Sequence, residues 1–130
     1  MAGNIIELSG LSVSVDSVCY TPDIETPEDR PFAFLYALTI HNQTRETIQI
    51  CGRKWVVTAV NGQQMVVEGD GVVGKFPRLK PGTSFSYNSY HVVSGISKAE
   101  GAFLGITDTG IPVFVRIPEF KMTPPAQQTN

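Results

Sequence analysis

The chain has 130 residues, 42% of them apolar, and a formal charge of -2 at pH 7. This size and composition predict a single compact domain, and the lack of clustered positive charge argues against nucleic acid as the main partner. There is no apolar run of about 18 residues and no basic N-terminal segment leading into one, so we expect a cytoplasmic protein without a membrane partner.

The first predicted elements are two strands separated by an acidic loop. From Leu11 to Val15, apolar and polar residues alternate, which is typical of a strand with one face on a core. Residues 21–31 contain three prolines and four carboxylates and predict an exposed loop. Residues 32–40 predict a central strand because apolar side chains share one face: Phe32, Phe34, Tyr36, Leu38 and Ile40.

The middle of the chain predicts a hairpin. Strands are expected at 47–50, 55–60 and 65–68, after a turn that begins at Asn42. Asn61-Gly62 lies between the last two of these strands and is the strongest short hairpin signal in the chain.

The C-terminal part repeats the pattern. Residues 84–92 predict a strand with one shared face: Phe85, Tyr87, Ser89 and His91. After a short connection at 95–100, strands at 102–107 and 113–117 are expected to form a hairpin through Asp108-Thr109-Gly110.

These elements predict an all-β protein, a fibronectin type III-like or immunoglobulin-like β-sandwich of two antiparallel sheets. The expected division is an N-terminal segment at 1–10, the sandwich at 11–121 and a disordered tail at 122–130. An immunoglobulin domain proper is not expected, because its tryptophan lies between two cysteines. Here Trp55 follows both Cys19 and Cys51. The two cysteines form no metal-binding spacing and are predicted to be buried free thiols.

A glycine loop at residues 69–74 reads Gly69-Asp70-Gly71-Val72-Val73-Gly74, the G-x-G-x-x-G pattern that cradles phosphate when it precedes a helix. No helix is expected here, because Pro77 and Pro81-Gly82 follow.

Two interpretations of the glycine loop remain open. In one, its amides form an anion-binding nest for pyrophosphate or a nucleotide phosphate, with these candidate residues: Gly69, Gly71, Gly74, Lys75, Arg78 and Arg53. In the other, which we favour, the glycines mark bulges or positive-φ turns, and Asp70 places a negative charge where an anion would bind.

Metal and catalytic signals are weaker. Glu68 and Asp70 are candidates to hold hydrated Mg²⁺ beside a bound phosphate. The only histidines, His41 and His91, have no metal-ligand spacing. Ser89 lies two residues before His91, but no carboxylate is placed to orient the imidazole. We therefore assign no catalytic residue and expect no resident cofactor.

Several separate motifs in one register give the chain a resemblance to the ApaG family, from about Leu11 to Lys121. The motifs that carry it are Arg53-Lys54-Trp55, the glycine loop, Leu79-Lys80-Pro81-Gly82, Phe85-Ser86-Tyr87-Asn88-Ser89 and Ile117-Pro118-Glu119-Phe120.

The resemblance implies a fibronectin type III-like sandwich, linked by name to cobalt and magnesium tolerance. Similar domains occur in F-box proteins and in a polymerase-interacting protein, which implies a binding module more than a catalyst. The chain departs from the family pattern at Lys54, where a histidine is common, and at Ile106, where an aromatic residue is usual.

The expected function is therefore a non-enzymatic module that binds a protein partner or a second copy of itself. An exposed strand edge is one candidate surface, and the glycine loop with Arg53, Lys54, Lys75 and Arg78 is the other. The alternative is a sensor of a small anion, pyrophosphate or nucleotide phosphate, that uses residues 69–74, with Mg²⁺ bound beside the phosphate.

Overall fold

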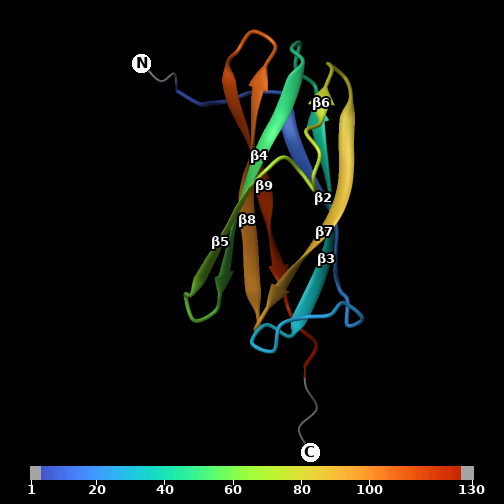
Figure 1. Ribbon diagram of the computed structural model, residues 1–130, viewed down its shortest axis with the longest axis vertical. Coiled ribbons are helices and arrows are strands. Elements are labelled where there is room, and N and C mark those ends of the chain that lie inside the picture. The colour runs from blue at the N-terminus through green and yellow to red at the C-terminus, as the bar shows by residue number, and fades with distance from the viewer. Residues whose placement is uncertain (1–3, 127–130) are drawn as a thin grey trace, which may run out of the picture.

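Two β-sheets packed face to face make up the protein (Figure 1). The computed structural model describes residues 4–126, and its strands are β1 (Ile6–Glu7), β2 (Leu11–Tyr20), β3 (Phe32–Asn42), β4 (Ile48–Ala59), β5 (Gln64–Asp70), β6 (Arg78–Leu79), β7 (Ser84–Val93), β8 (Ser97–Thr107) and β9 (Pro112–Met122). The predicted all-β sandwich is confirmed. No helix in the described range is long and apolar enough to cross a membrane.

The two sheets differ in size. The larger has the order β1-β9-β8-β4-β5, with the short β6 also paired to β4, and the smaller has the order β2-β3-β7. β3 is thus a central strand, as predicted, and both predicted hairpins, β4–β5 and β8–β9, are antiparallel pairs. One pair departs from the expected antiparallel pattern, because β1 runs parallel to β9.

Several strand boundaries differ from the predicted ones. The segments expected at 47–50 and 55–60 are parts of one strand, β4. Most of the connection expected at 95–100 belongs to β8, which starts at Ser97. β9 continues through the fully buried Met122, one residue into the predicted tail. Residues 123–126 form no strand, and the last part of the predicted tail, at 127–130, lies outside the described residues.

An aromatic cluster joins the two sheets at the centre of the core. Trp55 of β4 and Phe120 of β9 come from the larger sheet, and Tyr36 of β3 and His91 of β7 come from the smaller. The His91 ring lies 4.8 Å from that of Tyr36 and 4.6 Å from that of Trp55, centroid to centroid. These contacts bury large apolar areas and fix how the sheets face each other.

Three β-bulges change which residues face the core. The pairing register shifts at Asp16 in β2, at Cys51 in β4 and at Pro118-Glu119 in β9, opposite Glu100 of β8. Each extra residue reverses the alternation of side chains along its strand. Asp16 itself accepts hydrogen bonds from the hydroxyls of Thr39 and Ser14, which lower the pKa of its carboxyl group.

The prediction of buried cysteines is wrong: Cys19 and Cys51 are free, as expected, but both are exposed. The bulges explain the error. Beyond Asp16 the inward positions of β2 become Val18 and Tyr20, which pack against the core, so Cys19 points to solvent. Cys51 is itself the unpaired residue of the β4 bulge. A period-two pattern cannot reveal such an inserted residue.

His91 predicts a pH dependence of stability. Burial lowers the pKa of its imidazole from 6.5 to about 4. Between these values the unfolded chain binds a proton that the folded chain does not. The free energy of unfolding should therefore fall by about 3 kcal/mol as the pH drops from 7 to 4. Urea denaturation at a series of pH values measures this.

The matched control is His91→Phe, which keeps a stacked ring and removes the titrating group. The His91 Nε2 atom is buried without a hydrogen-bond partner in the described structure, so this variant should be at least as stable at pH 7. Its stability should change less between pH 7 and 4 than that of the natural protein. Equal slopes for the two proteins would contradict the assignment to His91.

Candidate functional site

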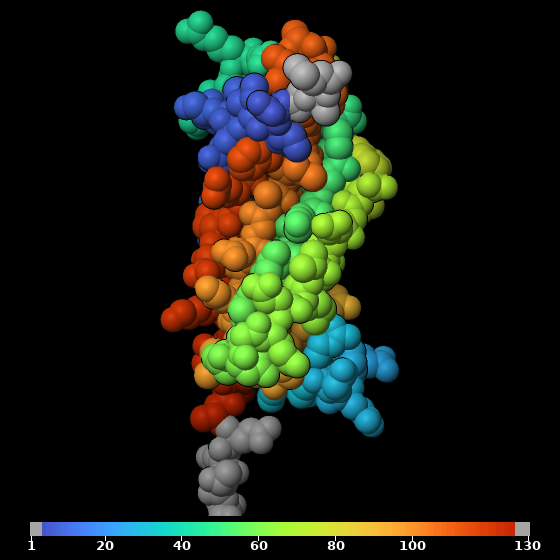
Figure 2. All heavy atoms as spheres, turned by 90° about the vertical axis from the view of Figure 1, so that its left-hand side faces the viewer, coloured from blue at the N-terminus to red at the C-terminus, as the bar shows by residue number. Residues whose placement is uncertain are grey.

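The strand β5 lies at the border of the larger sheet and is not covered by the smaller one. Its only hydrogen-bonded neighbour among residues 4–126 is β4, and none of its seven residues is buried. Val66 is 54% exposed and Val67 is 36% exposed, although they point to opposite faces of the sheet. Figure 2 shows this segment, in yellow-green, at the surface of the molecule. We call the unpaired border of residues 64–70 the β5 edge.

A shallow hollow of about 690 Å³ lies beside the β5 edge. It is lined by residues of β4, β5 and β8: Cys51, Gly52, Arg53, Lys54, Glu68, Gly69, Asp70 and Leu104. Four of the eight predicted anion and metal candidates therefore meet here, namely Arg53, Gly69, Glu68 and Asp70. The other four candidates, Gly71, Gly74, Lys75 and Arg78, do not line this hollow.

Arg53 is held by the backbone of the glycine loop. One of its Nη atoms donates to the carbonyl oxygens of Asp70, at 2.9 Å, and Gly71, at 3.1 Å. Gly69 lies directly opposite Arg53 in the ladder, and a Cβ there would stand 2.8 Å from the guanidinium. Gly69 is therefore explained by the close approach of this side chain.

The positive charge of Arg53 also affects the pKa values of two core tyrosines, Tyr36 and Tyr87. Burial raises the pKa of the Tyr36 hydroxyl, while a hydrogen bond from Ser89 and the nearby Arg53 charge act in the opposite direction. Burial raises the pKa of Tyr87 as well. Both hydroxyls are therefore protonated at neutral pH and can act as hydrogen-bond donors.

The remaining glycine loop forms a tight turn and not the start of a helix, as predicted. Val72 and Lys75 exchange two backbone hydrogen bonds, of 2.7 and 2.9 Å, around Val73 and Gly74. Both of these middle residues have positive φ, 49° and 75°, as a type I′ turn requires. The amide of Gly71 donates to the carbonyl of Cys51 at 2.8 Å.

Few amides of this loop are free to bind an anion. Those of Gly71, Val72 and Lys75 donate to backbone carbonyls, whereas those of Val73 and Gly74 make no hydrogen bond within residues 4–126. An anion at the loop would therefore meet two amides and the exposed Lys75 side chain. The assignment of these residues to an anion site stays a prediction.

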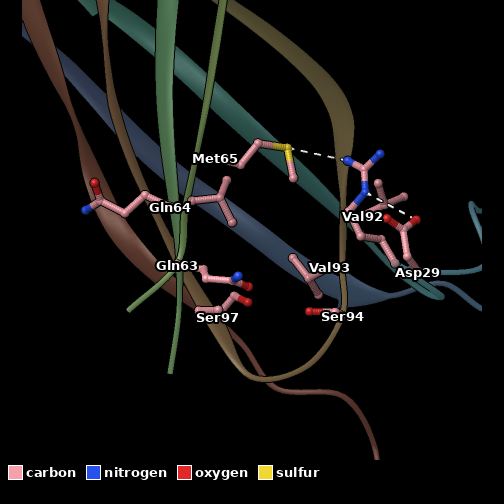
Figure 3. Close-up of a pocket in the computed structure, with 11 residues that line it drawn as sticks. Asp29, Gln63, Gln64, Met65, Val92, Val93, Ser94 and Ser97 are labelled. Atoms are coloured by element: carbon pink, nitrogen blue, oxygen red, sulfur yellow. Dashed lines mark hydrogen bonds and ion pairs between the residues drawn. The ribbon is translucent and has the colours of Figure 1, made fainter. Parts of the chain in front are cut away.

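A second hollow opens at one end of the sandwich, beside Asp29 and Arg30 of the acidic loop 21–31 (Figure 3). It has a volume of about 440 Å³ and is lined by residues of β4, β5, β7, β8 and the acidic loop. We call it the end cleft. It contains none of the site residues predicted from sequence.

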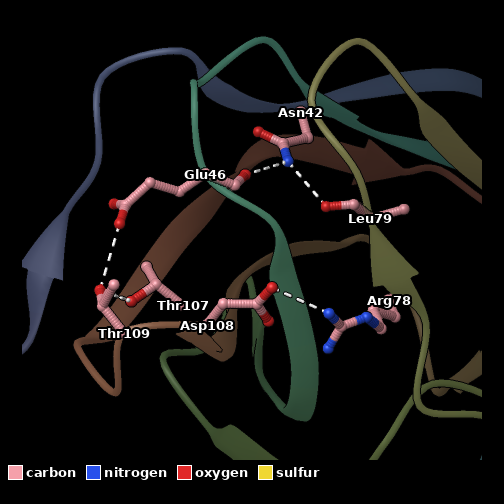
Figure 4. Close-up of polar contacts among 7 residues, drawn as sticks. All are labelled: Asn42, Glu46, Arg78, Leu79, Thr107, Asp108 and Thr109. Atoms are coloured by element: carbon pink, nitrogen blue, oxygen red, sulfur yellow. Dashed lines mark hydrogen bonds and ion pairs between the residues drawn. The ribbon is translucent and has the colours of Figure 1, made fainter.

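Arg78 lies at the opposite end of the sandwich and is engaged there. Its guanidinium forms an ion pair with Asp108 at 2.8 Å, which ties β6 to the β8–β9 hairpin (Figure 4). Nearby, the buried Asn42 amide donates to the carbonyls of Glu46 and Leu79, each at 2.8 Å. In this structure Arg78 is paired with Asp108 and does not join the glycine loop.

The two metal candidates do not form a cluster. Glu68 is paired with Lys54 at 3.6 Å, and the described residues hold no group of three or more side chains suited to a metal ion. The histidines also lie apart: His41 Nε2 is 2.9 Å from the Ser14 hydroxyl, and His91 is in the aromatic core. A Mg²⁺ ion here would need further ligands from a bound phosphate.

Sequence reasoning missed the exposure of Val66 and Val67. Adjacent valines between turns are typical of a buried strand, and the local pattern holds no signal that the opposite sheet ends before reaching them. It also missed the end cleft, because the side chains around it come from five separate segments.

The fold and these surfaces define a single β-sandwich domain with an open strand edge, a hollow beside that edge and a cleft at one end. A family model described as the ApaG domain matches residues 22–105. The chain belongs to the ApaG family.

Relatives and a solved structure agree with this assignment. The chain is 37% identical over 113 residues to Protein ApaG of Acidithiobacillus ferrooxidans, covering 86% of this chain and 88% of the relative. It is 36% identical to Protein ApaG of Vibrio cholerae, with 82% and 85% covered. A crystal structure from Bordetella pertussis that carries the name ApaA protein superposes with a TM-score of 0.79 at 31% identity, covering 94% of this chain and 99% of that one.

The glycines of the loop differ in the steric demand on them, which predicts different mutant stabilities. A Cβ at Gly71 would collide with the Lys75 carbonyl, whereas Gly74 has open space around it. Gly71→Ala should destabilise the protein by about 3 kcal/mol or more, and Gly74→Ala by about 1 kcal/mol. Thermal and urea unfolding measure both. Similar losses for the two variants would contradict this account of the turn.

Proposed function

We propose that the chain is a non-catalytic binding module that holds an extended segment of a partner protein along the β5 edge. One observation carries this proposal: β5 has a single neighbouring strand and no buried side chain in the described structure. The backbone groups on its open side are available to hydrogen-bond an added strand.

The side chains of the β5 edge suit an added strand. Val66 and Val67 offer apolar contacts on the two faces of the sheet, so a partner strand with alternating apolar residues would gain from both. Lys54, paired with Glu68 across the ladder, supplies charge of both signs nearby. This mixture favours a defined partner over unselective aggregation.

We place this module in the cytoplasm, where exposed thiols such as Cys19 and Cys51 stay reduced. The link to cobalt and magnesium tolerance implied by the family resemblance would then act through the partner. Pairing with a second copy of the chain at the same edge is the competing outcome, and the experiment below separates the two.

The test is photo-crosslinking in living cells, with a benzophenone residue introduced at Gln64 of β5. We expect a crosslinked species containing one copy of this chain and one partner protein. It should disappear in the double variant Val66→Lys, Val67→Lys, because lysines on an edge strand oppose strand addition.

The matched control is Leu35→Lys, Tyr90→Lys, which alters two neighbouring residues on the smaller sheet that are 36% and 48% exposed. This variant should keep the crosslink, and both double variants should melt within a few degrees of the natural protein. Loss of the crosslink in both, or in neither, would contradict the proposal. A crosslinked species of two copies of this chain would instead show self-pairing.

A second candidate function is the sensing of a small anion by the glycine loop. The observation that favours it is Val73, a β-branched residue held at φ 49°. Such strained residues are concentrated at functional sites, and here the amides of the exposed Val73 and Gly74 make no hydrogen bond in the described structure and lie next to Lys75. Pyrophosphate or a nucleotide phosphate, with Mg²⁺, is the ligand class.

This candidate predicts saturable NMR shifts confined to residues 69–75 when pyrophosphate is added, with stronger binding in the presence of Mg²⁺. Lys75→Ala should weaken the affinity about tenfold. Because Arg78 is paired with Asp108, Arg78→Ala should change it less. Unchanged spectra at millimolar pyrophosphate and ATP, with and without Mg²⁺, would leave the glycines with a structural role alone.

A further inference from the structure

The end cleft is an opening between the two sheets at the end of the sandwich where the β4–β5 hairpin and the β7–β8 connection lie. Its walls are the ends of β4 and β5 on one side, the β7–β8 connection on another, and Asp29 and Arg30 of the acidic loop on the third (Figure 3). The volume of about 440 Å³ is within the range of small-molecule sites.

Arg30 contributes a guanidinium to this cleft, and the N–H groups of that guanidinium make only weak contacts within the described part of the protein. One Nη atom donates to the sulfur of Met65 at 3.4 Å, and the Nε atom lies 3.9 Å from a carboxylate oxygen of Asp29. A thioether is a weak acceptor, and the Asp29 side chain is 84% exposed, so both contacts are weak. The guanidinium therefore lines the cleft, and no close carboxylate within residues 4–126 neutralises its charge.

The charges around Arg30 select among anions. The same loop carries four carboxylates, Asp23, Glu25, Glu28 and Asp29, against one guanidinium. Their repulsion disfavours a doubly charged phosphate more than a singly charged group. A planar carboxylate also matches the paired donors of one arginine.

The rest of the lining suits an apolar group attached to that carboxylate. Val57 and Val93 are buried residues at the ends of β4 and β7, and the Met65 side chain reaches toward the acidic loop (Figure 3). Gln63 and Ser94 add polar atoms to the wall. A ligand with a carboxylate at Arg30 and an apolar side chain against Val57 and Val93 would fit both the charged and the apolar part of the cleft.

We propose that the end cleft binds a carboxylate that carries an adjacent apolar side chain, with Arg30 as its anchor. The carboxylate displaces the Met65 sulfur from the guanidinium, and the apolar side chain covers Val57 and Val93. The same chemistry occurs in a free apolar amino or keto acid and in the C-terminal residue of a peptide. This site is separate from the β5 edge and does not depend on strand addition there.

The test is an NMR titration of the labelled protein with four probes: N-acetyl-leucine, N-acetyl-leucinamide, a tetrapeptide ending in leucine with a free carboxylate, and inorganic phosphate. Saturable shifts at Arg30, Met65 and Ser94 are expected with the two carboxylates. The amide should bind at least about tenfold more weakly, because it lacks the charge that pairs with Arg30. Tighter binding of the tetrapeptide than of N-acetyl-leucine identifies a peptide C-terminus as the source, and the reverse order identifies a free acid.

Arg30→Gln should weaken the binding of N-acetyl-leucine at least about tenfold. Arg45→Gln, at an exposed arginine in the β3–β4 turn, should leave it unchanged. Met65→Leu keeps the apolar wall but removes the sulfur that competes for Arg30, so this variant should bind N-acetyl-leucine as tightly as the natural protein or more tightly. Because it also breaks the Arg30–Met65 contact, it separates loss of the anchoring charge from loosening of the acidic loop. Val66→Lys, Val67→Lys should have no effect.

Equal affinity for the acid and the amide would overturn the proposal, as would retained acid binding in Arg30→Gln. Stronger shifts of the same amides with inorganic phosphate than with the carboxylates would also overturn it, because the acidic loop should disfavour that ion.

Discussion

The β-bulge at Cys51 is the constraint on which the arrangement around the candidate site depends. One inserted residue reverses the alternation along β4, so Ile50 before it and Trp55 after it both point into the core. The backbone around the bulge also receives the next segment, because the Cys51 carbonyl accepts the amide of Gly71 and the Ile50 amide donates to the carbonyl of Pro77. A single irregularity thus fixes both the central tryptophan and the glycine loop.

The same bulge explains why Arg53 does not act as a free surface cation. Two residues before the inward-pointing Trp55, Arg53 lies on the same side of β4 and is half-buried. Its guanidinium is bonded to carbonyls of Asp70 and Gly71 and rests against Gly69. The glycine loop therefore resembles a phosphate-binding loop in sequence. In the structure its glycines make room for the Arg53 side chain and form a two-residue turn.

A mismatch in size between the sheets accounts for the β5 edge and for one wall of the end cleft. Six strands face three, so the smaller sheet does not cover β5. Along its length the uncovered strand is an open edge, and at its start Gln64 and Met65 form part of one wall of the end cleft. Both features follow from how many strands each sheet contains, which is a property of the whole topology and of no single motif. They favour a module that recognises extended or terminal segments of other chains.

The sequence by itself determined the seven longer strands in outline, the hairpins at Asn61-Gly62 and Asp108-Thr109-Gly110, the inward faces of β3 and β7, and the family. These depend on local periodicity, turn residues and motif order. The tertiary structure alone decided that Cys19 and Cys51 are exposed, that Arg78 pairs with Asp108, and that Arg30 meets Met65. The physical reason is that a bulge, an uncovered strand and a contact between residues 35 positions apart arise from long-range pairing. Beyond hairpins, local residue patterns contain no information on which distant strands will pair or pack together.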